Sequence, residues 1–134
     1  METTKQLGFR INLTTDFATA EEWVTTALKA EGFGILTEID VKATLKKKID
    51  VDFRPYKILG ACNPPLAHQA LVTMPEAGLL LPCNVTLAQA DDGSIDVNII
   101  DPIIMLSVGD YPALAPIAAE ARARLERVVT ALRA

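Results

Sequence analysis

Apolar and polar residues alternate over two stretches near the start of the chain, with a helical pattern between them. Apolar residues take every second position over 7–13, and a similar alternation returns over 33–39. A period of two is typical of a strand with one buried face. Residues 19–22, Thr-Ala-Glu-Glu, match a capping box, an apolar stripe begins at Trp23, and Gly32 ends it. The pattern predicts a helix between two strands.

The middle of the chain continues this alternation of helices and strands. Asp40 is placed to cap a helix whose apolar residues recur at every fourth position, Val41, Leu45 and Ile49, with lysines around its other side. Residues 56–61 then form a short apolar run, which predicts a third strand.

Prolines and turn residues mark the elements of the second half. Asn63 is a favoured N-cap, and prolines are tolerated in a first helical turn, so a helix is expected over 64–74. Residues 85–90 and 94–100 flank Asp-Asp-Gly, which predicts a hairpin. A last amphipathic helix is expected from near Ala113, where Pro116 falls in the first turn.

The predicted element order is β-α-β-α-β-α-β-β-α, in a single domain over residues 1–134. Strands that alternate have one packed face and one that is wet or covered by a partner. We therefore expect an α/β two-layer sandwich of the α+β type, with a mixed, largely antiparallel sheet and helices packed on one face. At 134 residues, half of them hydrophobic, the chain can bury a core without disulfides.

Charge and hydropathy narrow the range of partners. The formal net charge is -4, whereas nucleic-acid binding relies on Lys and Arg that neutralise phosphates. The same balance disfavours an anionic membrane surface, and no apolar run approaches the about 20 residues that span a bilayer. The first residues are polar and resemble no secretory signal. We expect a cytoplasmic protein with reduced cysteines and no nucleic-acid or membrane partner.

The candidate chemistry lies in one stretch, GACNPPLAHQALVTMPEAGLLLPCN, which holds both cysteines and the only histidine. Cys62 precedes a predicted helix, whose positive end favours a thiolate. However, two prolines remove N–H groups from that helix end, and free cysteine is often a buried structural residue. Cys83 heads the next strand, and a disulfide between the two would need Cα atoms within ~7 Å.

A metal site in this stretch would use Cys62, Cys83 and His68, one ligand short of the four that structural zinc prefers. At ~100° per residue, His68 lies roughly 130° from the centre of the apolar stripe on its helix. That direction predicts an exposed histidine. No dinucleotide fingerprint, P-loop or nucleophile elbow occurs in the sequence, and no cofactor can be named from it.

Carboxylates give a further candidate. Glu38 and Asp40 are two apart on a predicted strand and share a face, and Asp96 and Asp101 lie on or near another strand. Paired carboxylates can act as acid and base, although exposed strand faces carry them routinely.

Four phrases of the sequence resemble one protein family. They are GFGILTEIDVKATLKKKIDVDFRPYKILGAC, GACNPPLAHQAL, GLLLPCNV and DGSIDVNIIDP. Together they resemble the bacterial and archaeal family called domain of unknown function 302, over residues 9–133. The resemblance implies a compact α/β fold and a homodimer, and it implies no reaction. The family signature falls on Glu38, Asp40, Cys62, Asn63, Pro64, Ala67, Leu71, Leu81, Pro82, Cys83, Asn84, Asp101 and Pro102.

Three functions are compatible with these residues. The first is a dimeric binding module that holds a small ligand or a metal where the two Cys-Asn pairs converge, with asparagine amides as donors and acceptors. The second is an interaction protein with packed cysteines and no ligand site, and the third is a thiol redox protein. The mirrored Cys-Asn pairs favour the first. Its candidate ligand-binding residues are Cys62, Asn63, Cys83, Asn84, Glu38 and Asp101.

Overall fold

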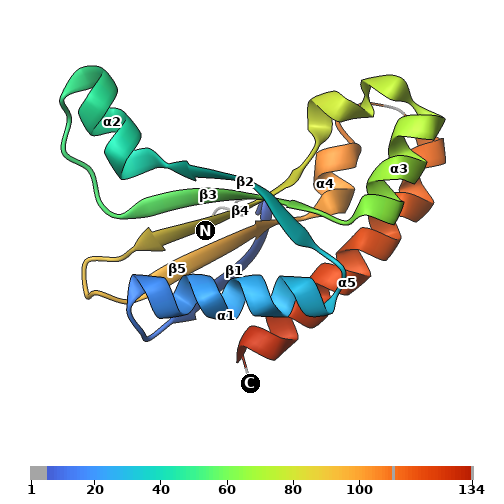
Figure 1. Ribbon diagram of the computed structural model, residues 1–134. Coiled ribbons are helices and arrows are strands. Elements are labelled where there is room, and N and C mark those ends of the chain that lie inside the picture. The colour runs from blue at the N-terminus through green and yellow to red at the C-terminus, as the bar shows by residue number, and fades with distance from the viewer. Residues whose placement is uncertain (1–5, 110, 134) are drawn as a thin grey trace, which may run out of the picture.

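The computed structural model describes residues 6–109 and 111–133, which form a five-stranded sheet with helices over one face and at one end (Figure 1). The strands are β1 (Gly8–Leu13), β2 (Gly34–Asp40), β3 (Tyr56–Cys62), β4 (Cys83–Gln89) and β5 (Ile95–Ile100). The helices are α1 (Phe17–Ala30), α2 (Val41–Ile49), α3 (Pro64–Thr73), α4 (Pro102–Leu106) and α5 (Ala115–Arg133), with short 3-10 helices η1 (Pro75–Leu80) and η2 (Pro112–Leu114). The expected two-layer α+β sandwich is confirmed.

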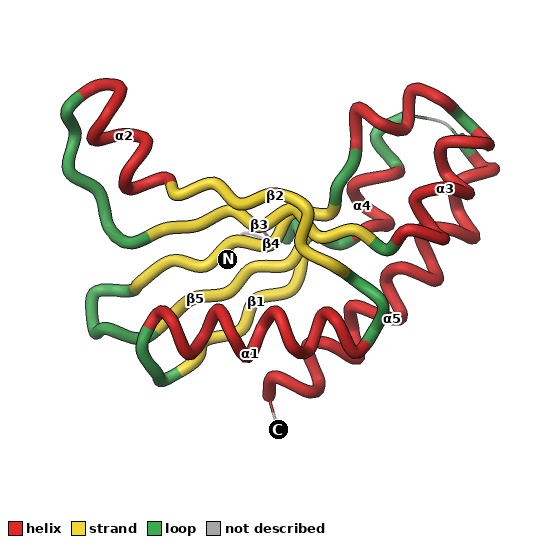
Figure 2. The backbone as a smooth tube through the Cα atoms, viewed as in Figure 1, coloured by secondary structure: helices red, strands yellow, loops and turns green. Residues whose placement is uncertain are grey.

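The strands lie in the order β1-β5-β4-β3-β2, and each neighbouring pair is antiparallel. The parallel pairing that a mixed sheet would contain does not occur in the described residues. The reason is the connection through α1, which carries the chain from β1 at one edge to β2 at the other (Figure 2). The predicted hairpin is confirmed, with β4 and β5 joined through 91–93.

One face of the sheet is covered by α1 and α5. Alternate residues of the strands point to this face and are buried, as the predicted period of two requires. The main core consists of Ile11, Leu13, Ala20, Val24, Leu28, Phe33, Leu59, Ala61, Val85, Leu87, Ile95, Val97, Ile99, Leu125, Val128 and Val129. No helix in the described part of the chain is both long and apolar enough to cross a membrane.

Helix α1 begins earlier than predicted. Its N-cap is Asp16, whose carboxylate accepts hydrogen bonds from the Thr19 N–H at 2.7 Å and the Thr19 hydroxyl at 3.1 Å. The capping box predicted at 19–22 is therefore wrong, because Asp16 already satisfies the free amide. Trp23 is 47% exposed, so it lies outside the buried stripe, which runs through Ala20, Val24 and Leu28.

A second apolar cluster lies beyond the end of the sheet. We call α3, η1 and α4 the helical lobe; together with η2 and the first half of α5 they enclose Leu66, Ala70, Ala77, Leu106, Leu114, Ile117, Ala118 and Ala121. The predictions that Asn63 caps α3 and that Asp40 caps α2 are confirmed. Helix α4 was not predicted from the sequence. The last helix was expected from near Ala113 and begins at Ala115, after the turn η2.

At the opposite end of the sheet, the connection between β2 and β3 carries α2 (Figure 1). We call α2 and its flanking residues, 39–53, the arm. The predicted stripe of Val41, Leu45 and Ile49 forms one side of α2, yet no residue of this helix is buried. Val41 and Leu45 are half-buried and Ile49 is 63% exposed, so the described chain covers this stripe only in part.

Candidate functional site

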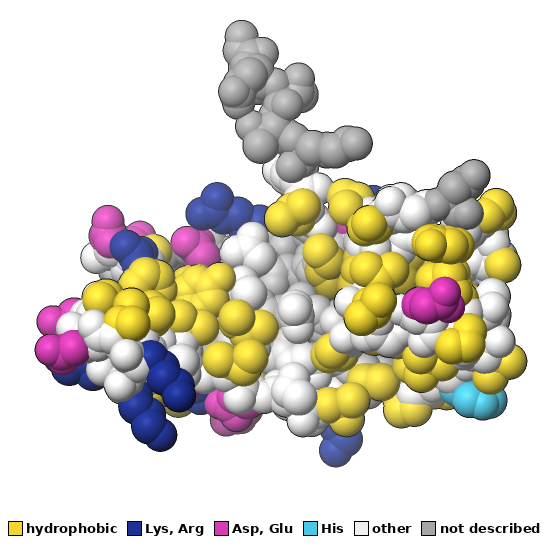
Figure 3. Space-filling model, turned by 90° about the horizontal axis from the view of Figure 1, so that it is seen from above, with side chains coloured by type: hydrophobic (Ala, Val, Ile, Leu, Met, Phe, Trp, Pro, Cys, Tyr) yellow, Lys and Arg dark blue, Asp and Glu magenta, His cyan; other side chains and the backbone are white. Residues whose placement is uncertain are grey.

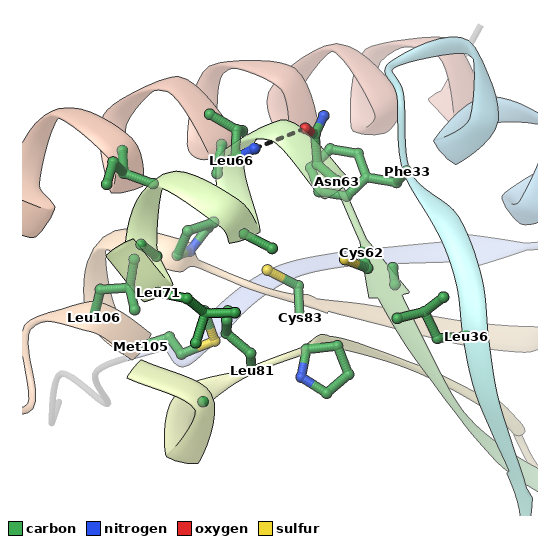
Figure 4. Close-up of a pocket in the computed structure, with 18 residues that line it drawn as sticks. Phe33, Leu36, Cys62, Asn63, Leu66, Leu71, Leu81, Cys83, Met105 and Leu106 are labelled. Atoms are coloured by element: carbon green, nitrogen blue, oxygen red, sulfur yellow. Dashed lines mark hydrogen bonds between the residues drawn. The ribbon is translucent and has the colours of Figure 1, made fainter. Parts of the chain in front are cut away.

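The clearest cavity of the molecule lies where the sheet meets the helical lobe. Its volume is about 270 Å³, and residues of β2, β3, α3, η1, β4, α4 and α5 line it. Figure 4 shows its lining, which includes Phe33, Leu66, Leu81, Met105 and Leu106. No Asp, Glu, Lys, Arg or His is found among the described lining residues. The site is an apolar pocket at the junction of the two cores.

Both cysteines lie at this pocket, as the sequence suggested (Figure 4). Cys62 ends β3, and Cys83 begins β4 opposite Ala61, the neighbour of Cys62. Antiparallel pairing therefore brings together two thiols that are separated by a helix in the chain. Cys83 is buried and Cys62 partly exposed, and neither forms a disulfide. The peptide bond between Leu81 and Pro82, just before Cys83, is cis.

Burial controls the acidity of the two thiols. It raises the pKa of Cys62, and it raises the pKa of Cys83 to about 11, with a smaller contribution from the nearby Cys62. A thiolate in apolar surroundings loses its hydration, which disfavours the charged form. Pro64 and Pro65, which follow Asn63, have no N–H groups that could offset this loss at Cys62. Both thiols are therefore protonated at neutral pH.

Asn63 is held by structural hydrogen bonds at the rim of the pocket. Its Oδ1 accepts from the Leu66 N–H at 3.3 Å, which caps α3, and its Nδ2 donates to the Glu31 carbonyl at 3.4 Å. The same carbonyl accepts from Arg124 at 3.1 Å. Gly32 has a φ of +88°, and a Cβ there would lie 2.9 Å from Asn63 Nδ2. Asn63 thus links the start of α3 to the end of α1, where Arg124 from the middle of α5 binds the same carbonyl.

Asn84 does not reach the pocket. Successive residues of a strand point to opposite faces, so Cys83 faces the pocket while Asn84 faces the open side of the sheet. There it lines a separate, open depression together with Thr86, Asn98 and Arg10. The expectation that the two Cys-Asn pairs converge is therefore met for the sulfurs and for Asn63 only.

The two predicted carboxylates also lie away from the pocket lining. Glu38, on β2, forms an ion pair with Lys57, which also pairs with Glu21 at 3.0 Å. Both carboxylates raise the pKa of Lys57, and Glu38 has the larger effect. Asp101 caps α4 by accepting from the Ile103 N–H at 2.9 Å and pairs with Arg122 at 3.1 Å. Asp101 supports the pocket indirectly, because α4 forms one of its walls.

His68 is exposed on α3, as its predicted direction required, and it is not among the residues that line the pocket. In the described part of the chain, no three His, Cys, Asp or Glu side chains meet in an arrangement suited to a metal ion. The predicted set of Cys62, Cys83 and His68 is therefore not assembled. Only the two sulfurs of that set share one site.

Several residues that line the pocket were not predicted from the sequence. Leu36 comes from β2, Met105 from α4, and Ile117 and Ala121 from α5. A usable signal was present for α4, because Asp101-Pro102 repeats the cap-and-proline pattern of Asn63-Pro64. The contribution of α5 had no local signal, since it depends on how the long helix crosses the lobe.

Comparisons with known proteins agree with this architecture. The family model described as "Domain of unknown function DUF302" matches residues 9–132. The crystal structure of an uncharacterized conserved DUF302 protein from Bacillus stearothermophilus is similar, with 28% sequence identity and a TM-score of 0.83 over 96% of this chain and 98% of that one. No curated protein matches the chain. The chain therefore belongs to the DUF302 family.

Proposed function

We propose that the protein is a binding module that takes a small, predominantly apolar molecule into the pocket between the sheet and the helical lobe. The observation that carries this proposal is a cavity of about 270 Å³ that both thiols line and that has no charged side chain among its described lining residues. Binding in such a pocket removes apolar ligand surface from water, which is favourable. Pockets of this kind are the usual sites of small-molecule binding.

The volume limits the size of the ligand. Engineered apolar cavities of about 150 Å³ accept benzene. The pocket is larger, at about 270 Å³, and it is open at one side. We therefore expect a ligand with on the order of ten non-hydrogen atoms enclosed in the pocket, by proportion to the benzene cavity.

The state of the thiols supports binding over redox chemistry. Burial raises the pKa of both cysteines, so the thiolate that would act as nucleophile is scarce at neutral pH. A neutral sulfur is polarisable and makes favourable contacts with aromatic rings. With the amide of Asn63 already bonded to backbone groups, shape and apolar contact are left to select the ligand.

A pocket-filling variant tests the proposal. Ala67 of α3 lines the cavity, whereas His68 is the next residue and is exposed. We expect A67F to weaken the binding of indole and 1-octanol at least tenfold, and H68F, with the same new side chain outside the pocket, to bind like the wild type. Ligand-observed NMR measures both affinities, and circular dichroism confirms that both variants fold.

Two outcomes would contradict the proposal. One is the absence of saturable binding of either probe to the wild-type protein. The other is equal binding by A67F and the wild type, which would place the probes elsewhere. Either result would favour the interaction protein with packed cysteines. In that case C62A and C83A would still fold and assemble like the wild type, with only lower stability.

A further inference from the structure

Three uncharged polar side chains lie on the sheet face that α1 and α5 leave open. They are Asn84 and Thr86 of β4 and Asn98 of β5, and both strands are inside the sheet rather than at its edges. Thr86 is directly opposite Asn98 in the register, and Asn84, two residues from Thr86, points to the same face. Side chains that are directly opposite in an antiparallel pair have Cβ atoms about 5 Å apart. We call these three residues the polar cluster.

The two asparagines of the polar cluster are exposed, and the fold does not explain them. Asparagine is depleted in strands, so its presence on two inner strands goes against local preference. Asn12, on the same face of β1, has a structural role, because its Nδ2 donates to the Ser94 hydroxyl and to Asp96 Oδ1, each at 2.9 Å. The side chains of the polar cluster form no hydrogen bond with another described residue. Residues that break a local preference without a structural gain are expected at functional sites.

The polar cluster lines an open depression of about 470 Å³. Tyr56 and Arg10 also line it, from the flanking strands β3 and β1. Arg10 is the only charged side chain among the described lining residues, and it pairs with Asp96 at 3.3 Å. Seen from above in Figure 3, a largely uncharged polar surface lies between the hydrophobic side chains over α2 and those over the helical lobe. The depression therefore offers hydrogen-bonding groups with little net charge.

The hydrogen-bonding capacity of these groups indicates the class of ligand. An asparagine amide, a threonine hydroxyl and a tyrosine hydroxyl can each both donate and accept. The hydroxyl groups of a sugar also donate and accept, so they can pair with every one of these side chains. An anion can only accept, and the one cationic side chain at the depression is already paired. The apolar faces of a sugar ring find matching surface at Ile100 and at the ring of Tyr56.

We propose that the open face of the sheet binds a neutral sugar through the amides of Asn84 and Asn98 and the hydroxyl of Thr86. This site is separate from the apolar pocket, because no described residue lines both, and it does not rest on the proposed function. Water competes for hydrogen bonds at an exposed surface, so each one contributes little net free energy. Binding is therefore expected to be weak and to depend on several side chains together.

NMR titration with glucose and with N-acetylglucosamine tests the site. We expect saturable shifts of the side-chain amide signals of Asn84 and Asn98 with at least one of these sugars. The double substitution N84A/N98A should weaken that binding at least tenfold, and T86V, which keeps the shape of the side chain, should weaken it less. Q69A removes an exposed amide of α3 that lies outside the depression, and this matched control should bind like the wild type.

The substitutions N84V and N98V separate a binding role from a structural one. Valine is enriched in strands and has no hydrogen-bonding side chain, so each variant should lose affinity for the sugar without losing stability. Urea unfolding should give each variant a midpoint equal to or above that of the wild type. A lower midpoint in both variants would show that the amides stabilise the sheet, and it would contradict the argument for a site.

Three further results would overturn the proposal. The first is the absence of saturable shifts with either sugar, and the second is binding that N84A/N98A leaves unchanged. The third is a change of sedimentation coefficient in N84A/N98A together with no sugar binding, which would make this face a contact between copies of the chain. Binding of indole in the apolar pocket should be the same in N84A/N98A and in the wild type, so each site is tested independently of the other.

Discussion

Helices α1 and α2 begin in the same way and end in different environments. Each is capped by an aspartate that accepts from the N–H three residues ahead, Asp16 from Thr19 and Asp40 from Ala43. Helix α1 then buries Ala20, Val24 and Leu28 against the sheet, whereas α2 buries no residue. A cap and an apolar stripe therefore suffice to specify a helix locally. They do not specify what covers it.

The largest expected difference concerns apolar truncation. Leu28 is fully buried, and Ile49 is 63% exposed. We expect L28A to lower the free energy of unfolding by about 3 kcal/mol, because it leaves a cavity in the core. I49A should change it by less than about 0.5 kcal/mol under dilute, monomeric conditions. Urea unfolding followed by circular dichroism measures both values, and similar losses would show that the arm is part of the cooperative core.

The second prediction concerns the buried thiol of Cys83 at the pocket; the arm contains no cysteine. The unfolded Cys83 thiol ionises near its ordinary pKa of 9.0, and the folded one at about 11. Between these values the unfolded state loses a proton that the folded state keeps, so stability falls as pH rises. The difference between these two pKa values corresponds to about 3 kcal/mol.

Urea unfolding at a series of pH values checks this window. Wild type should lose up to about 3 kcal/mol more than C83A between pH 9 and about 11, from the same pKa shift. The pKa of Lys57 is also raised, by Glu38 and to a smaller extent by Glu21. Because Lys57 is present in both proteins, its contribution cancels in the difference between them. Parallel pH profiles for the two proteins would show that Cys83 is solvated in the folded state.

The smallest expected effects concern the two caps. D16A should lower the stability of the whole fold, because α1 is docked on the core. D40A should instead speed hydrogen exchange of the α2 amides alone, since that helix can open locally. The hydrogen bonds from Thr19 lower the pKa of Asp16, so its contribution is lost as pH falls through that pKa. Exchange at α1 and α2 that responds equally to D40A would mean that the two helices unfold together.

Much of the fold was predictable because it follows from local pattern. Alternation located the strands, and Asp40, Asn63 and Asp-Asp-Gly located two helix starts and the hairpin. The errors also have local causes. Asp16 is a better cap than the predicted Thr19, because its carboxylate reaches both the amide and the hydroxyl of that threonine. The Asp101-Pro102 start of α4 was overlooked inside an apolar run.

The candidate site was predictable only in part. The two cysteines share a pocket, as expected, because antiparallel β3 and β4 place the end of one strand and the start of the other at the same edge of the sheet, where the pocket lies. Asn84 was assigned to the same pocket by its place in the repeated Cys-Asn pattern. A strand turns successive side chains to opposite faces, so the pattern that brings Cys83 to the pocket sends Asn84 to the other side.

The sequence by itself determined the elements, their caps and the alternation that makes one sheet face apolar. Only the tertiary structure decided that α4 and α5 complete an apolar pocket at the sheet end, and that α2 has no fully buried residue. The physical reason is the distance along the chain over which each effect acts. Periodicity and capping act within a few residues, whereas pockets and uncovered faces depend on how distant elements pack.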